Sequence, residues 1–157
     1  MKPARLLLVA LAILAIGSAA RSLPSASTVD ANPSLALNVR TPVPARVVSL
    51  LRRACFDCHS DETRWPWYAH LPVASHLIER DVQDGRAQLN WSHWAEYNPF
   101  DRAGILDKAC ELASMKDMPP WRYRILHPEA QLTATEIADL CAWTRLEASR
   151  LTQGGGS

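Results

Sequence analysis

Apolar residues recur at intervals of three and four in four stretches of the chain, which is the spacing of one face of an α-helix. We find no run that alternates apolar and polar residues as a half-buried strand does. The pattern therefore predicts an all-α fold of three or four helices. The predicted apolar faces are Val47, Val48, Leu50, Leu51 and Ala54; Val73, Leu77, Ile78 and Val82; Ile105, Leu106, Ala109, Cys110, Leu112 and Ala113; and Ile137, Leu140, Cys141 and Trp143 with Thr144.

Residues that start and stop helices flank these stretches. Pro44 suits the first turn of the first helix, and Pro72 begins the second, which Gly85 is placed to end. Asn98 followed by Pro99 opens the third helix, which ends before Pro119. The run from Thr133 to Glu136 is a capping box, so the last helix has the clearest start.

The N-terminal stretch is typical of an export signal. Two basic residues precede an apolar run from Leu6 to Ile16, and small residues follow, so residues 1–20 are predicted to be a signal peptide cut after Ala20. An uncleaved anchor through residues 6–20 in the inner membrane is the alternative, although 15 residues fall short of the roughly 20 that span a bilayer. Either interpretation places the protein outside the cytoplasm, in the periplasm. Residues 21–41 are predicted to be a flexible linker, 42–151 the folded domain, and 152–157 a disordered tail.

Composition agrees with one small domain. With 157 residues, of which 48% are hydrophobic and 21% charged, the chain can form a single core. A net charge of +1 gives no footprint for nucleic acid. Eleven prolines and six tryptophans indicate a loop-rich chain whose large aromatic side chains cover something flat and apolar.

The strongest chemical signal is Cys55-Phe56-Asp57-Cys58-His59, a C-x-x-C-H run. Two thiols three positions apart on a helical turn can form thioethers with the vinyl groups of one porphyrin, and the next residue then lies under the iron. The run therefore predicts one covalently attached haem c with His59 as an iron ligand. Half of a zinc site is the alternative, but the other cysteines, Cys110 and Cys141, are too far apart in sequence to supply the second pair.

Aromatic and basic residues after the motif are candidates for contact with the haem. Trp65 and Trp67 flank Pro66 and belong either to a haem pocket or to an ordinary core. Arg86 and the indole N–H of Trp94 are predicted to bond the haem propionates, whose charge would otherwise be unpaired. The alternative for Arg86 is a plain surface arginine.

The second axial ligand of the iron is predicted to be Met118, because the following Pro119-Pro120 would stiffen the loop that presents its thioether. Met115 continues the apolar face of the third helix and is expected to be core. His127 or an open distal position remains the alternative, and His70, His76 and His93 are more remote in sequence.

A set of short runs, taken in order, resembles the haem-binding domain family of small bacterial monohaem proteins. The resemblance extends from about Val47 to Trp143 and implies haem binding, a cytochrome c-like helical fold and a place for Tyr123 at the haem. At one point the chain departs from the family, because it has Ser75-His76 where a tryptophan is expected after the serine. The runs are C-F-D-C-H-S-D-E-T-R-W-P-W-Y from Cys55, Asp81-Val82 with Gly85-Arg86, Asn90-Trp91-Ser92-x-Trp94, Met118-Pro119-Pro120-x-x-Tyr123, and His127-Pro128.

Three functions compete. Electron transfer to redox partner proteins is preferred, because a haem with two axial ligands leaves no place for a substrate. The others are a peroxidase-type enzyme, which needs an open distal position and an acid–base group such as His127 or His70, and a gas-binding module in which a ligand displaces Met118. Export and an even number of remaining cysteines also predict a disulfide between Cys110 and Cys141, with two free buried thiols as the alternative.

Overall fold

The computed structural model describes residues 36–37 and 41–154, and the predicted signal segment and most of the predicted linker lie outside these residues. The described part is all-α, as predicted, and it contains no strand. It has more helices than predicted, because the haem motif and the segment after Pro120 each form a short one of their own. The α-helices are α3 (Ala45–Ala54), α4 (Phe56–His59), α5 (Pro72–Gln88), α6 (Pro99–Ser114), α7 (Trp121–Leu126) and α8 (Ala134–Gly154), and the 3-10 helices are η3 (Trp67–His70), η4 (Trp91–Glu96) and η5 (Pro128–Ala130).

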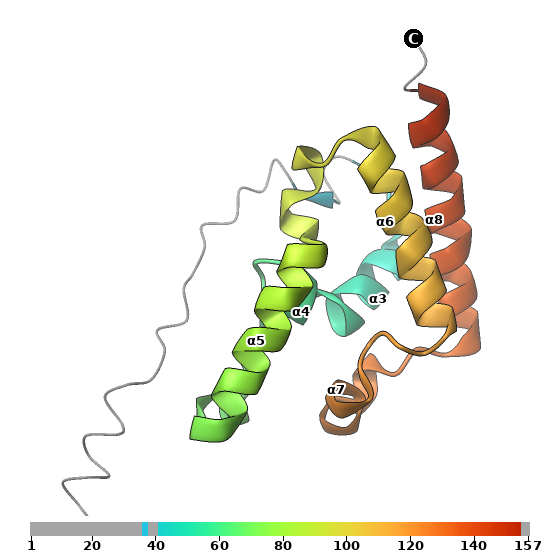
Figure 1. The fold of residues 1–157 in the computed structure, drawn as a ribbon. Coiled ribbons are helices and arrows are strands. Elements are labelled where there is room, and N and C mark those ends of the chain that lie inside the picture. The colour runs from blue at the N-terminus through green and yellow to red at the C-terminus, as the bar shows by residue number, and fades with distance from the viewer. Residues whose placement is uncertain (1–35, 38–40, 155–157) are drawn as a thin grey trace, which may run out of the picture.

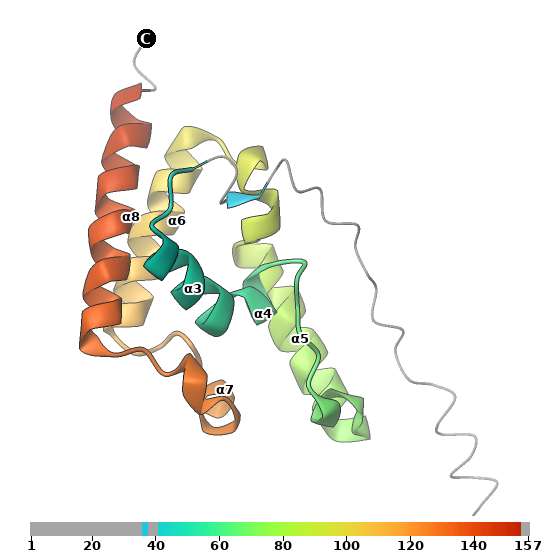
Figure 2. The same ribbon diagram turned by 180° about the vertical axis from the view of Figure 1, so that it is seen from behind.

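The helices form two groups with the motif between them. Helices α6 and α8 run antiparallel side by side, and their packing is the most extensive between any two elements (Figure 1). Figure 2, from behind, shows α3 and α4 crossing between this pair and α5. Helix α7 lies at the end of the molecule where α5 begins. Among the described residues, no helix has the length and apolar character needed to cross a bilayer.

The predicted starts of α6 and α8 are confirmed by their caps. The Asn98 side chain accepts a hydrogen bond of 2.9 Å from the backbone N–H of Asp101. At α8, Thr133 Oγ1 accepts from the Glu136 N–H at 3.2 Å, and the Glu136 carboxylate accepts from the Thr133 N–H at 2.8 Å. These bonds satisfy backbone groups that a helix start leaves unpaired, so short-range sequence is enough to place the start.

The folded part extends beyond the predicted range 42–151 at both ends. Leu37 belongs to the hydrophobic core and Thr41 is buried, although both fall in the predicted linker. At the other end, α8 continues through Thr152 to Gly154, inside the predicted tail. No helix-breaking residue precedes Gly154, so the last helix continues beyond the residues of its apolar face.

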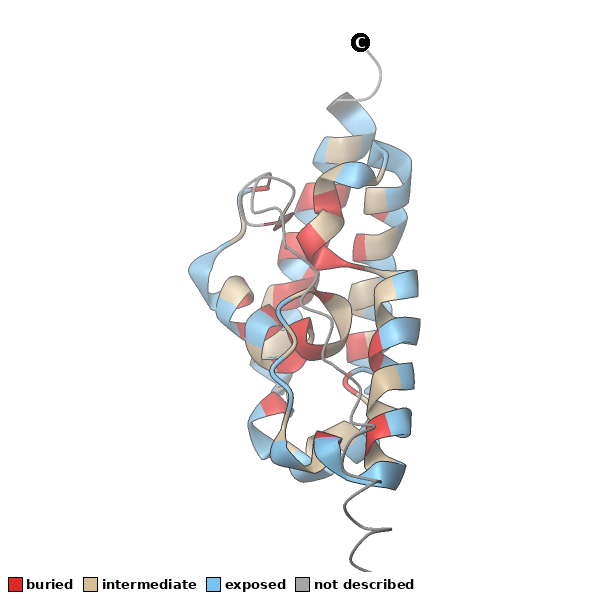
Figure 3. Cartoon of the chain, turned by 90° about the vertical axis from the view of Figure 1, so that its left-hand side faces the viewer, coloured by how far each residue is buried: buried red, intermediate tan, exposed pale blue. Residues whose placement is uncertain are grey.

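The predictions for α5 need two corrections. The helix does not stop at Gly85 but continues to Gln88. Its apolar stripe is not core along its whole length, because only Val82 is buried, whereas Val73 is 78% and Leu77 58% exposed. Figure 3 shows buried residues gathered in the middle of the molecule and exposed residues at the lower end, where α7 and the first turns of α5 lie.

Candidate haem-binding site

The C-x-x-C-H motif forms one tight turn at the end of α3. The backbone N–H groups of Cys58 and His59 both donate to the Cys55 carbonyl, at 3.2 and 2.9 Å. This turn makes α4 and brings the two thiols and the imidazole into one compact unit. Cys55 and Cys58 are free, partly buried cysteines, so neither is used in a disulfide.

His59 is held in an orientation suited to binding a metal. Its Nδ1 lies 3.1 Å from the carbonyl oxygen of Leu89, just after α5 ends. A carbonyl oxygen can only accept, so Nδ1 carries the proton and Nε2 keeps its lone pair. Burial lowers the pKa of His59 below its usual value, which also favours the neutral imidazole. Ligating histidines commonly have such a carbonyl as the partner of their other ring nitrogen.

Gly85 allows α5 to approach the motif closely enough for this bond. A Cβ atom at position 85 would lie 2.6 Å from the Cys58 carbonyl oxygen, closer than real Cβ contacts come. The glycine has no positive φ, so its role is close packing of backbone against backbone. Sequence reasoning assigned this residue to a helix end, and it lies at a helix crossing instead.

The two motif thiols stay protonated in the fold. Burial, with the neighbouring Cys58, raises the pKa of Cys55 to about 12. Burial, with Asp81 and Asp57, raises the pKa of Cys58 to about 11. Zinc binds thiolates, and among the described residues no cluster of three or more His, Cys, Asp or Glu could hold a metal ion.

Arg86 holds the loop that follows the motif. Its Nε donates to the Ser60 carbonyl at 2.9 Å and its Nη2 to Thr63 Oγ1 at 3.0 Å. It also lies 3.9 Å from Asp61, whose side chain is almost fully buried. These hydrogen bonds hold residues 60–63 against α5. The predicted contact of Arg86 with a propionate stays a prediction.

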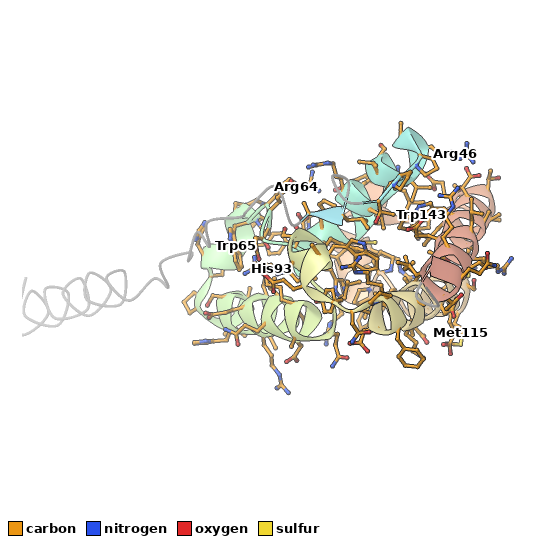
Figure 4. The ribbon with its side chains drawn as sticks, turned by 90° about the horizontal axis from the view of Figure 1, so that it is seen from above. Arg46, Arg64, Trp65, His93, Met115 and Trp143 are labelled. Carbon is orange, nitrogen blue, oxygen red and sulfur yellow. A yellow bond between two sulfur atoms is a disulfide. The ribbon has the colours of Figure 1, made fainter. Side chains whose placement is uncertain are left out.

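The tryptophans of the site have different surroundings from those expected. Trp94 is 0% exposed, and its indole N–H donates to Thr41 Oγ1 at 2.9 Å, so its predicted bond to a propionate stays a prediction that would require this bond to break. Its neighbour Trp91 is also buried, yet its Nε1 finds no acceptor among the residues that the structure describes. Trp91 is thus the better candidate for donating to a propionate. Trp65 is at the surface beside Arg64 (Figure 4).

Tyr123 reaches the motif from α7. Its hydroxyl donates to Asp57 Oδ2 at 2.6 Å, and Asp57 lies between the two cysteines. The same carboxylate accepts from the backbone N–H and the side chain of Arg64 at 3.1 to 3.3 Å. Burial, and then Asp57, raise the pKa of Tyr123 above its usual value, so it remains a donor. Sequence reasoning missed Asp57, although its position inside the motif was the available signal.

Met118 lies in the loop between α6 and α7, followed by a cis peptide bond to Pro119. It lines a cavity of about 140 Å³ together with residues of α6, α7 and α8, among them Ala113, Arg124 and Ile137. Cys55, Cys58 and His59 do not line this cavity. Met115 is 53% exposed at the surface (Figure 4), so the prediction that it belongs to the core is wrong.

Both ring nitrogens of His127 have hydrogen-bond partners. Its Nε2 lies 2.6 Å from the Tyr68 hydroxyl, and its Nδ1 lies 3.1 Å from Glu129 Oε1. Its ring stacks on Tyr123 with centroids 4.2 Å apart. Neither nitrogen has a free lone pair for iron unless one of these bonds breaks, so this arrangement favours Met118 over His127 as the distal candidate.

The ends of α5 and α7 present apolar side chains that the described polypeptide leaves uncovered. The set extends over one end of the molecule, on the two elements that flank the motif helix. A porphyrin is a flat apolar group that such side chains would cover. The exposed members are Leu71, Val73 and Leu77 near the start of α5, and Trp121, Ile125 and Leu126 on α7.

Fold and site together define a small all-α haem protein. The family model of the haem-binding domain matches residues 13–146, and the chain belongs to this family. The cytochrome c peroxidase Ccp of Escherichia coli (strain K12) is 28% identical over 102 residues, which cover 62% of this chain and 22% of that protein. The chain thus spans under a quarter of the length of this relative. No solved structure matches this chain.

Proposed function

We propose that this domain binds one haem c, with thioether bonds to Cys55 and Cys58 and with His59 and Met118 as axial ligands, and that it transfers electrons outside the cytoplasm. The observation that carries this proposal is the 3.1 Å bond between His59 Nδ1 and the Leu89 carbonyl within a C-x-x-C-H turn. This bond fixes the tautomer whose Nε2 can bind iron.

The residues of the site would hold the group rigidly. Haem iron supplies a one-electron couple, whose potential depends on its axial ligands and surroundings. Leu89 keeps the His59 ring in place, and Arg86 keeps the following loop in place. The apolar side chains of α5 and α7 would exclude water from the porphyrin. A site that changes little between two oxidation states suits rapid electron exchange.

Export follows from the N-terminal residues, which lie outside the described part of the chain. We infer a periplasmic location, with residues 1–20 as a signal peptide or as an anchor through residues 6–20. Haem c attachment in bacteria also takes place outside the cytoplasm, so this inference and the motif support each other. The partners would be redox proteins, since a net charge of +1 does not favour nucleic acid.

A peroxidase-type enzyme is the second candidate, and the similarity to a cytochrome c peroxidase favours it. Such an enzyme needs an open distal position and a free acid–base group. His127 is bonded to Tyr68 and Glu129, and His70 is exposed. Electron transfer therefore agrees better with these side chains.

Spectroscopy of the holoprotein tests the proposal. The protein is produced with a cytochrome c maturation system, and a pyridine haemochrome of the c type is expected, with both thioethers formed. Cys55→Ala should leave one thioether, which the haemochrome spectrum detects. A two-thioether spectrum in this variant would disprove the attachment model.

The distal ligand is tested by a matched pair of methionine variants. The ferric protein should show the far-red band of sulfur bound to iron. Met118→Ala should lose the band and lower the reduction potential, because a thioether favours ferrous iron. Met115→Ala, an exposed methionine three residues away, should keep both. High-spin ferric haem and rapid turnover of peroxide in the unmodified protein would instead favour the peroxidase.

A further inference from the structure

The buried carboxylate of Asp57 connects two parts of the molecule on which the haem site depends. Asp57 belongs to α4, between the cysteines, whereas Tyr123 belongs to α7. The 2.6 Å bond between them joins elements 66 residues apart in sequence. A hydrogen bond to a charged acceptor is stronger than one between neutral groups, and burial excludes competing water.

The carboxylate is itself firmly placed. Arg64 donates to Oδ1 from its backbone N–H at 3.1 Å and from Nε at 3.2 Å, and to Oδ2 from Nη2 at 3.3 Å. Each oxygen of Asp57 therefore has two donors, counting the Tyr123 hydroxyl. The negative charge is paired without any group from outside the protein.

The Tyr123 ring is placed from its other side. His127 stacks on it with an angle of 18° between the planes, and the Tyr68 hydroxyl holds His127. The hydroxyl thus has a fixed direction toward α4. These contacts leave α7 little freedom to rotate.

Helix α7 in turn controls the Met118 loop, because Trp121 begins it two residues after Pro119. Arg124 Nη1 donates to the Lys116 carbonyl at 3.1 Å, which ties the loop to α7. The other end of the loop is fixed by α6, where the Met118 N–H donates to the Leu112 carbonyl at 3.2 Å. The loop that carries Met118 is therefore held by α6 at one end and by α7 at the other.

We propose that the hydrogen bond from Tyr123 to Asp57 is a latch that holds α7 on the haem-attachment helix, so that Tyr123 is a positioning residue for the distal ligand Met118. The proposal rests on the proposed function, because it takes Met118 as that ligand. The latch connects the attachment side of the haem to the distal loop through one hydroxyl. Without it, an external ligand would replace the methionine more easily.

The test is displacement of the methionine by imidazole in the purified ferric holoprotein, followed through the far-red band. Tyr123→Phe removes one oxygen atom and should lower the apparent dissociation constant of imidazole about tenfold, as expected for loss of one charge-assisted hydrogen bond. Tyr97→Phe is the matched control. It also removes a tyrosine hydroxyl, but that hydroxyl accepts from the Asn90 N–H at 2.9 Å and contacts neither α7 nor the Met118 loop, so the constant should change less than twofold.

An unchanged constant in Tyr123→Phe would overturn the latch, and so would equal changes in the two variants. Absence of the far-red band from the unmodified protein would refute Met118 ligation, and with it the positioning role. Hydrogen exchange then measures the latch without reference to the iron, since the α7 amides should exchange about tenfold faster in Tyr123→Phe. Equal exchange would show that the bond does not hold α7.

Discussion

Replacing Gly85 with alanine should push α5 away from the haem-attachment helix. The new Cβ would lie 2.6 Å from the Cys58 carbonyl oxygen and 3.1 Å from its carbonyl carbon and Cβ. The obstacle is backbone, and the turn from Cys55 to His59 holds that backbone in place, so a side-chain rotation cannot relieve the contact. The helices themselves must separate, and the bond from His59 to Leu89 must lengthen with them.

A second glycine gives the comparison that isolates this contact. Gly104 also lies inside a helix, and a Cβ there would meet nothing within 4 Å. Alanine raises helix propensity at both positions, by about 1 kcal/mol. Only position 85 adds overpacking, which costs roughly 1–3 kcal/mol. The difference in free energy of unfolding between the two variants is therefore about 1–3 kcal/mol, because the propensity contribution cancels.

Thermal unfolding of the two purified holoproteins, at the same pH and salt, measures this difference. Gly104→Ala should unfold at or above the temperature of the unmodified protein. Gly85→Ala should unfold roughly 4–12 °C below Gly104→Ala, as expected for a domain of this size. The reasoning is refuted if the two variants unfold at the same temperature, since α5 would then tolerate the added methyl group against Cys58.

Two further predictions concern stability. The Cys110–Cys141 disulfide joins residues 31 positions apart, and its reduction should lower the free energy of unfolding by about 3–4 kcal/mol. Denaturant unfolding with and without dithiothreitol measures this loss, and an unchanged free energy would contradict the prediction. Hydrogen bonds to Glu96 and then Asp61 raise the pKa of His93, so their stabilisation is complete below the unfolded value of 6.5 and is lost as pH rises through the folded pKa. The unfolding temperature should fall over that interval, and His93→Gln should flatten the fall; an identical pH profile in the variant would contradict this.

Sequence reasoning succeeded where the cause of a feature is local. The caps at Asn98 and Thr133 involve residues three positions apart, so the starts of α6 and α8 follow from the sequence. The disulfide of the structure joins the two cysteines that were predicted to pair, with their Cα atoms 4.9 Å apart. That prediction rested on export and on the even number of remaining cysteines, and not on a local contact, since 31 positions separate the pair.

It failed where a residue acts through a distant neighbour. Glycine is common at helix ends, which is why Gly85 was predicted to end α5. Its position opposite Cys58 is set instead by the crossing of α5 and α4. Trp94 was assigned to a propionate because the charge of that group needs a donor, and nothing in the sequence indicates that Thr41, 53 positions away, accepts from its N–H. The Leu89 carbonyl could not be found at all, because any residue provides one.

The apolar residues predicted to form one stripe on α5 do not share one face of the helix. Val73 and Leu77 are four residues apart, but Val82 follows Val73 by nine residues, which is half a turn around the helix. Only Val82 is covered by the described polypeptide. Val82 is three residues from Gly85, which faces α4, whereas Val73 lies on the opposite side of the helix from Val82. Apolar periodicity predicts that a face is buried, but it does not say by what. Spacings of four and five residues can drift around a helix, so the angle between the first and last members of a stripe has to be checked before the whole stripe is assigned to the core.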